Sequence, residues 1–179
     1  MTIPTKEELG FDPEALRTKY RTERDKRLRE EANEQYKEVK GEYAGFIKDP
    51  NISQLLSREA LTDEVEIAII GGGFGGLIAG VRLKELGFHN IRIIEKGGDF
   101  GGTWYWNRYP GAACDTEAYV YLPLLEELDY MPTKKYVYAP EILSHCKNIA
   151  KKYDLYNNAC LETEVTELQW DKNSSKWII

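Results

Sequence analysis

The stretch IAIIGGGFGG, residues 67–76, decides the fold expected for this chain. An apolar run opens into G-x-G-x-x-G, a pattern typical of the turn between the first strand and the first helix of a dinucleotide-binding unit. In such a turn Gly71 permits the tight bend, Gly73 lets the backbone approach a pyrophosphate, and Gly76 lets helix and strand pack closely. The first N–H groups of the helix point at the phosphates. The stretch therefore predicts nucleotide binding.

The flanking sequence provides the context that this glycine pattern needs. Residues 65–70 form a short, mostly apolar run suited to a buried parallel strand. Apolar residues then continue with a helical period over 77–86 until Gly87, and 91–94 is predicted to be a second strand. Strand, glycine turn, helix and strand follow one another in the order of a Rossmann-like α/β fold.

Glu95 stands at the end of the second predicted strand. An acidic residue roughly 20 residues after the glycines accepts hydrogen bonds from a ribose hydroxyl of the adenosine half of the nucleotide. The alternative is a solvated charge at the end of a strand. Because a carboxylate there repels a 2′-phosphate, we expect this site to hold FAD or NAD(H) and not NADP(H).

The segment 97–115 is too rich in glycine and aromatic residues for an ordinary crossover helix. We interpret it as a loop around a cofactor, because glycines at 101–102 allow close backbone approach, and Trp104 and Trp106 offer flat apolar surfaces to a ring system. Asp115 supplies a charge beside it. The alternative is that both tryptophans are core residues and that Asp115 serves a turn or a cap.

These motifs resemble those of the Baeyer–Villiger flavin monooxygenases. The resemblance is carried by GGGFGGL at 71–77, by Glu95-Lys96, and above all by GGTWYWNRYPGAACDTEAY at 101–119. It continues at 121–127, Tyr136, 140–143 and 161–170, and so covers about two-thirds of the chain. The glycine motif is general, whereas the tryptophan-rich run is specific. Residues 1–64 resemble the long N-terminal extension of one branch of the family, whose members act on bulky or cyclic ketones.

The resemblance implies an enzyme that uses FAD, NADPH and O2 to insert one oxygen atom beside the carbonyl of a ketone, giving an ester or a lactone. It implies a Rossmann-like FAD-binding domain of the glutathione-reductase type at 65–179, incomplete at its C-terminal end, after a helical extension and linker at 1–64. Asp115 would be catalytic, because it would orient an arginine that stabilises developing negative charge. The cofactor-binding residues that the resemblance implies are Gly71, Gly73, Gly76, Glu95, Thr103, Trp104, Tyr105, Trp106, Asp115, Tyr121 and Val165.

The sequence lacks several motifs of the family pattern. The family's F-x-G-x-x-x-H-x-x-x-W fingerprint, its second glycine motif for NADPH and the arginine do not occur in these 179 residues. Ala113 stands where many relatives carry a larger polar residue that contacts NADPH. We therefore expect the chain to hold the first part of such an enzyme and to be inactive alone.

Two other functions stay open. The first is a non-catalytic nucleotide-binding or interaction module that has lost the chemistry of the family. The second is an N- or S-oxygenating flavin monooxygenase, which shares the glycine motif but is not expected to carry the tryptophan-rich run.

Composition excludes several classes of protein. A net charge of −6 argues against nucleic-acid binding, and the sequence shows neither an apolar stretch long enough to span a membrane nor a signal peptide. Three cysteines without metal-binding spacing favour a cytoplasmic setting, and we expect Cys114 to be a small buried thiol. No metal site is expected, because His89 and His145 are far apart in the sequence; we interpret both as ordinary surface or helix residues.

Outside the glycine motifs, periodicity predicts the remaining elements. Residues 12–39 carry a narrow apolar stripe at near-helical spacing, which would dock on the body of the enzyme or on a second subunit, unless the helix is simply solvated. Residues 46–64 are predicted to be a linker with a short helical piece. An amphipathic helix is expected at 140–153, and two strands at 161–170 and 176–179 are expected to form a hairpin.

Overall fold

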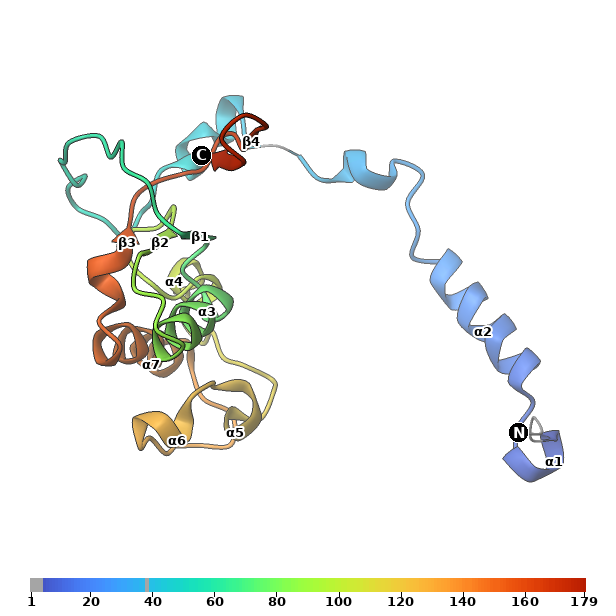
Figure 1. Cartoon of the computed structure of the whole chain (residues 1–179). Helices are drawn as coiled ribbons and strands as arrows, with labels where there is room; N and C mark the ends of the chain where they lie inside the picture. Colours follow the sequence, from blue (N-terminus) through green and yellow to red (C-terminus); the bar gives the residue numbers. More distant parts are fainter. Residues whose placement is uncertain (1–4, 38) are drawn as a thin grey trace. The chain divides into compact units, whose positions relative to one another are not determined.

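The computed structural model describes residues 5–37 and 39–179 (Figure 1). The chain divides into two compact units between Lys48 and Asp49. The sequence analysis placed a boundary later, between residues 64 and 65. The difference arises because the segment that follows Asp49 makes its hydrogen bonds with the second unit.

The first unit consists of short helices with little packing. It contains α1 (Lys6–Leu9), α2 (Pro13–Asp25) and two 3-10 helices, η1 (Ala32–Gln35) and η2 (Gly41–Ile47). Thr5 and Glu8 form a capping box on α1, and the Asp12 carboxylate accepts the N–H groups of Glu14 and Ala15 at the start of α2. None of the described residues in these helices is buried.

The helical stripe predicted over residues 12–39 is only partly present. The helix α2 ends at Asp25, and Ala32 adopts a left-handed φ of 46°, which a continuous helix does not allow. Tyr20 and Leu28 of the stripe are 69% and 65% exposed. Without tertiary packing on that face, a highly charged segment does not gain enough to stay helical. The short helical piece expected within 46–64 lies earlier, as η2.

The second unit is built on a parallel sheet. Its strands are β1 (Ile67–Ile70), β2 (Ile91–Ile94) and β3 (Ala159–Cys160), in the order β1-β2-β3. β1 pairs with β2 from Ile67↔Ile91, and β2 pairs with β3 from Ile93↔Ala159. The crossover helices are α3 (Phe74–Glu85) and α7 (Ala139–Lys152), with the 3-10 helix η3 (Leu155–Asn158) before β3. The predicted strands near 65–70 and 91–94 and the helices near 77–86 and 140–153 are confirmed within a few residues.

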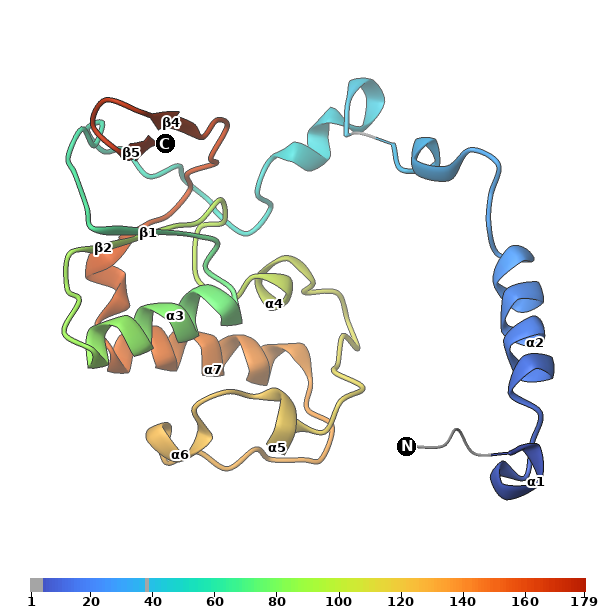
Figure 2. The same ribbon diagram turned by 45° about the vertical axis from the view of Figure 1, so that its right-hand side comes forward.

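Figure 2 shows α3 and α7 side by side on one face of this sheet, where the first part of the core lies. Gly80 of α3 faces Ile93 of β2, which is fully buried, and α7 adds apolar residues to the same cluster. The buried members of this cluster are Leu77, Val81, Ile93, Phe100, Leu124, Cys146, Ile149, Ala150 and Leu155. Burial of such side chains, at about 25 cal/mol per Å² of apolar surface, is the main stabilising contribution of this layer.

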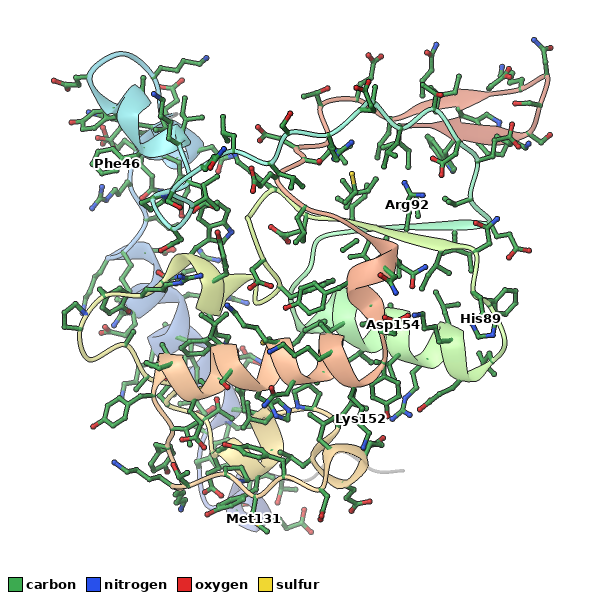
Figure 3. The ribbon with its side chains drawn as sticks, turned by 90° about the vertical axis from the view of Figure 1, so that its left-hand side faces the viewer. Phe46, His89, Arg92, Met131, Lys152 and Asp154 are labelled. Atoms are coloured by element: carbon green, nitrogen blue, oxygen red, sulfur yellow. The ribbon has the colours of Figure 1, made fainter. Side chains whose placement is uncertain are left out.

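The opposite face of the sheet carries polar contacts. Arg92 of β2 points away from α3 and α7 (Figure 3) and donates to the carboxylate of Asp63 at 2.7 Å. Lys176 of the C-terminal hairpin pairs with Glu64 in the same segment. One ion pair therefore joins this face to the chain before β1, and a second joins that chain to the hairpin.

Three short helices lie between β2 and α7. They are α4 (Thr103–Trp106), α5 (Ala118–Tyr121) and α6 (Leu125–Leu128). With the start of α7 they form a second buried cluster of Trp104, Ala112, Cys114, Ala118, Leu122, Val137, Ala139 and Ile142. Cys114 is 7% exposed, which confirms the expectation of a buried thiol.

The strand predicted at 161–170 is wrong in its extent. β3 ends at Cys160, and Glu162 has a left-handed φ of 51° that breaks the extended backbone. A separate hairpin follows, made of β4 (Gln169–Asp171) and β5 (Lys176–Ile178), which pair antiparallel with Trp170 opposite Trp177. The two indole rings meet edge to face at 5.3 Å, so the predicted hairpin itself is confirmed.

Candidate functional site

The first glycine loop joins β1 to α3, and two of its glycines are required by the backbone. Gly71 has a φ of 99°, which residues with a Cβ rarely adopt. A Cβ on Gly76 would lie 1.9 Å from the carbonyl oxygen of Gly71. The tight turn expected at Gly71 and the close helix packing expected at Gly76 are therefore seen directly.

Gly73 is the N-cap of α3, and no side chain caps this end of the helix. The first N–H groups of an α-helix have no partner within the helix, and the helix dipole adds partial positive charge there. Because the twelve-residue helix begins directly after a strand and a glycine turn, its uncapped end is suited to bind an anionic group.

A second glycine loop, residues 97–102, lies against the first. The Gly101 N–H donates to the carbonyl of Gly72 at 2.9 Å. Gly102 has a φ of 52°, and a Cβ there would lie 2.8 Å from the Cα of Gly73. The two loops are thus in backbone contact, and at Gly102 only glycine fits while the first loop stays in place.

Glu95 connects the two loops. Its side chain is 6% exposed, and its carboxylate accepts the Gly72 N–H at 2.5 Å and the Gly97 N–H at 2.6 Å. Two backbone N–H groups offset the cost of burying the carboxylate. A carboxylate has about four acceptor positions, so these bonds leave capacity for a ribose hydroxyl. The bridging of the loops is a second role that the sequence analysis missed.

A shallow cavity of about 240 Å³ opens at the carboxyl ends of the parallel strands. Nucleotides bind outside this edge in doubly wound sheets. Of the residues that the sequence analysis singled out, the cavity brings together Gly71, Glu95 and Val165. Lys96 and Glu164, which also line it, form an ion pair at 2.8 Å. The complete lining is Ile70, Gly71, Ile94, Glu95, Lys96, Thr163, Glu164 and Val165.

Trp104 and Tyr121 also come together. The indole N–H of Trp104 donates to the hydroxyl of Tyr121 at 2.9 Å, and the rings meet edge to face. Tyr121 in turn contacts Phe74, the first residue of α3, with ring centroids 5.4 Å apart. Burial raises the pKa of Tyr121, so its hydroxyl stays neutral at physiological pH. These rings form an aromatic wall next to the start of α3.

The other members of the tryptophan-rich run differ in exposure. Tyr105 is 2% exposed and its hydroxyl bonds within the protein, so its side chain serves the core. Trp106 is 38% exposed and packs edge to face on Tyr105, and Thr103 is exposed. Among the predicted cofactor residues of this run, Trp106 and Thr103 remain accessible to a ligand.

Asp115 stands apart from the cavity. It is exposed and follows an isolated antiparallel bridge between Ala113 and Tyr138. Within residues 5–37 and 39–179 the structure gives it neither a hydrogen bond nor an ion pair, so the carboxylate is available to a group outside these residues. Its catalytic role stays a prediction.

His145 is not a surface residue. It lies in α7 but is 1% exposed, and its Nε2 bonds the carbonyl of Pro123 at 2.6 Å. Burial lowers the pKa of this imidazole below its ordinary value, so it is neutral. In the part of the chain that the structure describes, histidine, cysteine and acidic side chains form no metal-binding group, and no helix there could cross a membrane.

Several residues of the expected linker reach this site, and the sequence analysis missed them. Asp49 accepts from the Tyr105 hydroxyl at 2.6 Å, and Arg58 donates to Thr163 Oγ1 at 2.8 Å. The N–H of Leu56 donates to Glu162 at 2.8 Å. Neither spacing nor periodicity marks these contacts, because they join positions far apart in the sequence.

Comparison with known proteins agrees with this geometry. Residues 69–130 match the family model of the NAD(P)-binding Rossmann-like domain. The chain is 52% identical over 169 residues to neopentalenolactone D synthase of Streptomyces avermitilis and 47% identical over 170 residues to a Baeyer–Villiger monooxygenase of Streptomyces coelicolor. The chain belongs to the Baeyer–Villiger monooxygenase family.

These alignments cover 94% and 93% of the chain but 28% of each of the two relatives, so the chain spans little more than a quarter of their length. Solved structures of monooxygenases agree. A polycyclic ketone monooxygenase from Thermothelomyces thermophila has a TM-score of 0.79 at 37% identity over 92% of this chain and 28% of that one. Cyclohexanone monooxygenase from Rhodococcus sp. Phi1 bound to NADP+ has a TM-score of 0.59 at 34% identity, over 63% of this chain and 22% of that one.

Proposed function

We propose that the protein carrying this chain is an FAD- and NADPH-dependent Baeyer–Villiger monooxygenase that converts a ketone to an ester or lactone. Residues 65–179 would form the N-terminal part of its FAD-binding domain. The observation that carries the proposal is the uncapped start of α3 directly beside the buried Glu95, at the carboxyl edge of the parallel sheet. The tryptophan-rich run at 101–119 favours this chemistry over N- or S-oxygenation.

The residues present fit FAD. The start of α3 would hold the pyrophosphate through backbone N–H groups, and Glu95 would accept a ribose hydroxyl while it bridges the glycine loops. The Glu95 carboxylate would repel the 2′-phosphate of NADPH. The cavity therefore suits the adenosine of FAD, and NADPH would bind elsewhere. When bound, the flavin supplies the redox chemistry that passes electrons from NADPH to O2.

The remaining predicted residues are proposed to shape the flavin side of the site. Trp106 and Thr103 are exposed near the second glycine loop, and Tyr121 stands by the start of α3. Asp115, exposed and without a partner among the described residues, would hold an arginine supplied from outside this chain where negative charge develops. Its role would be to position that arginine and not to retain FAD.

The long N-terminal extension and the substrate class form a further part of the proposal. The polycyclic ketone monooxygenase aligns with 92% of this chain, whereas cyclohexanone monooxygenase aligns with 63%. This supports a place in the branch that carries the extension, with bulky or polycyclic ketones as substrates. The three cysteines are free and buried, which supports an intracellular setting.

The test uses the natural protein that carries this sequence. We expect it to purify with bound flavin and to form lactone from polycyclic ketones when NADPH and O2 are supplied. Gly73→Asp should abolish FAD retention, because a side chain and a negative charge would occupy the place of the pyrophosphate. Gly45→Asp is the matched control, since a Cβ at Gly45 meets nothing within 4 Å.

Each result separates the open hypotheses. A wild-type protein that binds flavin but oxygenates no ketone would support a non-catalytic nucleotide-binding module. Oxygenation of amines or sulfides without any lactone would support the N- or S-oxygenating alternative. If Gly73→Asp purified with as much flavin as Gly45→Asp, the assignment of the first glycine loop would be wrong.

A further inference from the structure

The segment that starts at Asp49 is attached to the second glycine loop by several contacts. Asn51 Nδ2 donates to the carbonyl of Tyr105 at 3.3 Å. The side chain of Ile52 packs so closely on Gly98 that a Cβ there would lie 2.2 Å from the Cγ2 of Ile52. The segment before β1 is therefore a structural component of the site, not a spacer.

Asp49 forms the centre of this attachment. Its Oδ2 accepts the Tyr105 hydroxyl at 2.6 Å and the Gly98 N–H at 3.0 Å, while its Oδ1 accepts the Asn51 N–H at 2.8 Å. The Gly98 N–H also reaches the Tyr105 oxygen at 2.9 Å. Carboxylate, phenol and amide thus form a closed triangle in which each group contacts the other two.

The triangle fixes the ring of Tyr105 beneath the second glycine loop. A Cβ on Gly97 would lie 2.8 Å from Cε1 of that ring, so the loop backbone rests directly on it. The guanidinium of Arg108 also lies over this ring, 4.4 Å from its centroid. The ring has little room to move while Asp49 holds its hydroxyl.

The effect of Asp49 extends to the nucleotide cavity through Glu95. The Gly97 N–H donates to Glu95, and the same carboxylate holds Gly72 of the first glycine loop. Movement of the backbone at 97–98 would therefore displace Glu95 and open the contact between the two loops. Misplacement of a binding group by about 1 Å is enough to lose much of its interaction.

We propose that Asp49 is a positioning residue of the FAD site, which acts through Tyr105 and Gly98 to hold Glu95 and the two glycine loops in their binding arrangement. This inference rests on the proposed function, because it presumes that FAD occupies the cavity. The pKa values of Asp49 and of its partner Tyr105 agree with this arrangement. Hydrogen bonds from Tyr105 and from backbone N–H groups outweigh burial and keep the pKa of Asp49 below its ordinary value, and the partner phenol has its pKa raised to about 12 by burial and by Asp49.

The first test measures FAD affinity in the natural protein after the flavin has been removed and added back. We expect Asp49→Asn to weaken FAD binding by about ten-fold or more. The reason is that the amide carries no negative charge, so the charge-assisted bonds that Oδ2 accepts from Tyr105 and Gly98 are lost. Asp63→Asn is the matched control, since Asp63 lies in the same segment but pairs with Arg92 on the sheet. Its FAD affinity should equal that of the wild type.

The second test distinguishes positioning from a general loss of stability. Tyr105→Phe keeps the ring and removes only the hydroxyl, and it should weaken FAD binding as Asp49→Asn does. In the Tyr105→Phe background, Asp49→Asn should cost less than it does in the wild type, because the part of its effect that passes through the Tyr105 hydroxyl is already lost and only its bond to Gly98 remains. Ultraviolet titration isolates Tyr105 when the Tyr105→Phe curve is subtracted from that of the wild type, and that of the double variant from Asp49→Asn. The phenol should ionise at a lower pH in Asp49→Asn than in the wild type.

The outcomes separate the two proposals. Wild-type protein that binds no FAD would overturn the proposed function. If the wild type binds FAD, and both Asp49→Asn and Tyr105→Phe bind it as tightly as the wild type, the role of Asp49 is overturned and the proposed function is left intact. If Asp49→Asn does not fold, Tyr105→Phe alone decides, and FAD affinity equal to wild type there would refute the inference.

Discussion

The third glycine of the first loop offers the sharpest test of the fold. We expect Gly76→Ala to destabilise the protein strongly, whereas Gly75→Ala, one position earlier in α3, should stabilise it. At Gly76 the new Cβ would lie 1.9 Å from the Gly71 carbonyl oxygen, roughly 1 Å inside the shortest tolerated contact. At Gly75 a Cβ meets nothing within 4 Å.

The magnitudes follow from these distances. The atom that the Gly76 Cβ meets belongs to the backbone, so the start of α3 must move away from β1. Overpacking of this kind costs about 1–3 kcal/mol or more. In Gly75→Ala the methyl group is free of contacts and the unfolded chain loses entropy, which contributes about 0.4–1 kcal/mol to stability. The two variants should therefore differ by at least about 1.4 kcal/mol.

The assay compares the melting temperatures of the two variants with that of the wild type. It is carried out after removal of flavin, so that only the effect on the chain itself is measured. Gly75→Ala should melt at or above the wild-type temperature, and Gly76→Ala several degrees below it. A Gly76→Ala protein as stable as Gly75→Ala would refute the packing described at the start of α3.

Three further predictions concern the site and the chain. Asp115→Ala should retain FAD but slow flavin reduction or oxygen transfer in the natural protein, as measured by stopped-flow spectroscopy; wild-type rates would make Asp115 a turn residue. Burial and Asp49 raise the pKa of Tyr105 from about 10 to about 12 on folding, so its contribution to stability should be complete below about pH 10 and lost as the pH rises through about 12. Thermal melts over this pH range should show that loss in the wild type and not in Tyr105→Phe. The 179-residue chain, mixed with FAD, NADPH and cyclic ketones, should give no lactone above a free-flavin control by mass spectrometry, because these residues contain no second G-x-G-x-x-G motif to bind NADPH.

The elements of the parallel sheet could be predicted because their signals are local. The apolar run before Gly71, the helical period after it and the glycine at 87 each reflect backbone and packing requirements within a few residues. The helix α2 was overestimated, because an apolar stripe indicates a helix only if something packs on it, and Tyr20 and Leu28 are exposed. The break after Cys160 depends on the left-handed Glu162, which no local pattern marks.

The sequence pointed to residues that lie at the site, but it did not predict the contacts that they make. Glu95 was expected to face a ribose, and its bonds to Gly72 and Gly97 could not be foreseen, because they depend on how the second glycine loop folds back. Tyr105 was grouped with the cofactor residues, but its hydroxyl is taken by Asp49. A hydrogen bond across 56 residues leaves no trace in spacing or period.

The backbone contact between Gly73 and Gly102 also restricts how this site can evolve. A side chain at Gly102 would meet the Cα of Gly73 at 2.8 Å, so the second loop cannot accept a larger residue there while the first loop stays in place. We therefore expect glycine to be kept at position 102 wherever the first loop keeps this conformation. A search pattern that requires both loops at this spacing should recognise distant descendants more selectively than the first glycine motif alone.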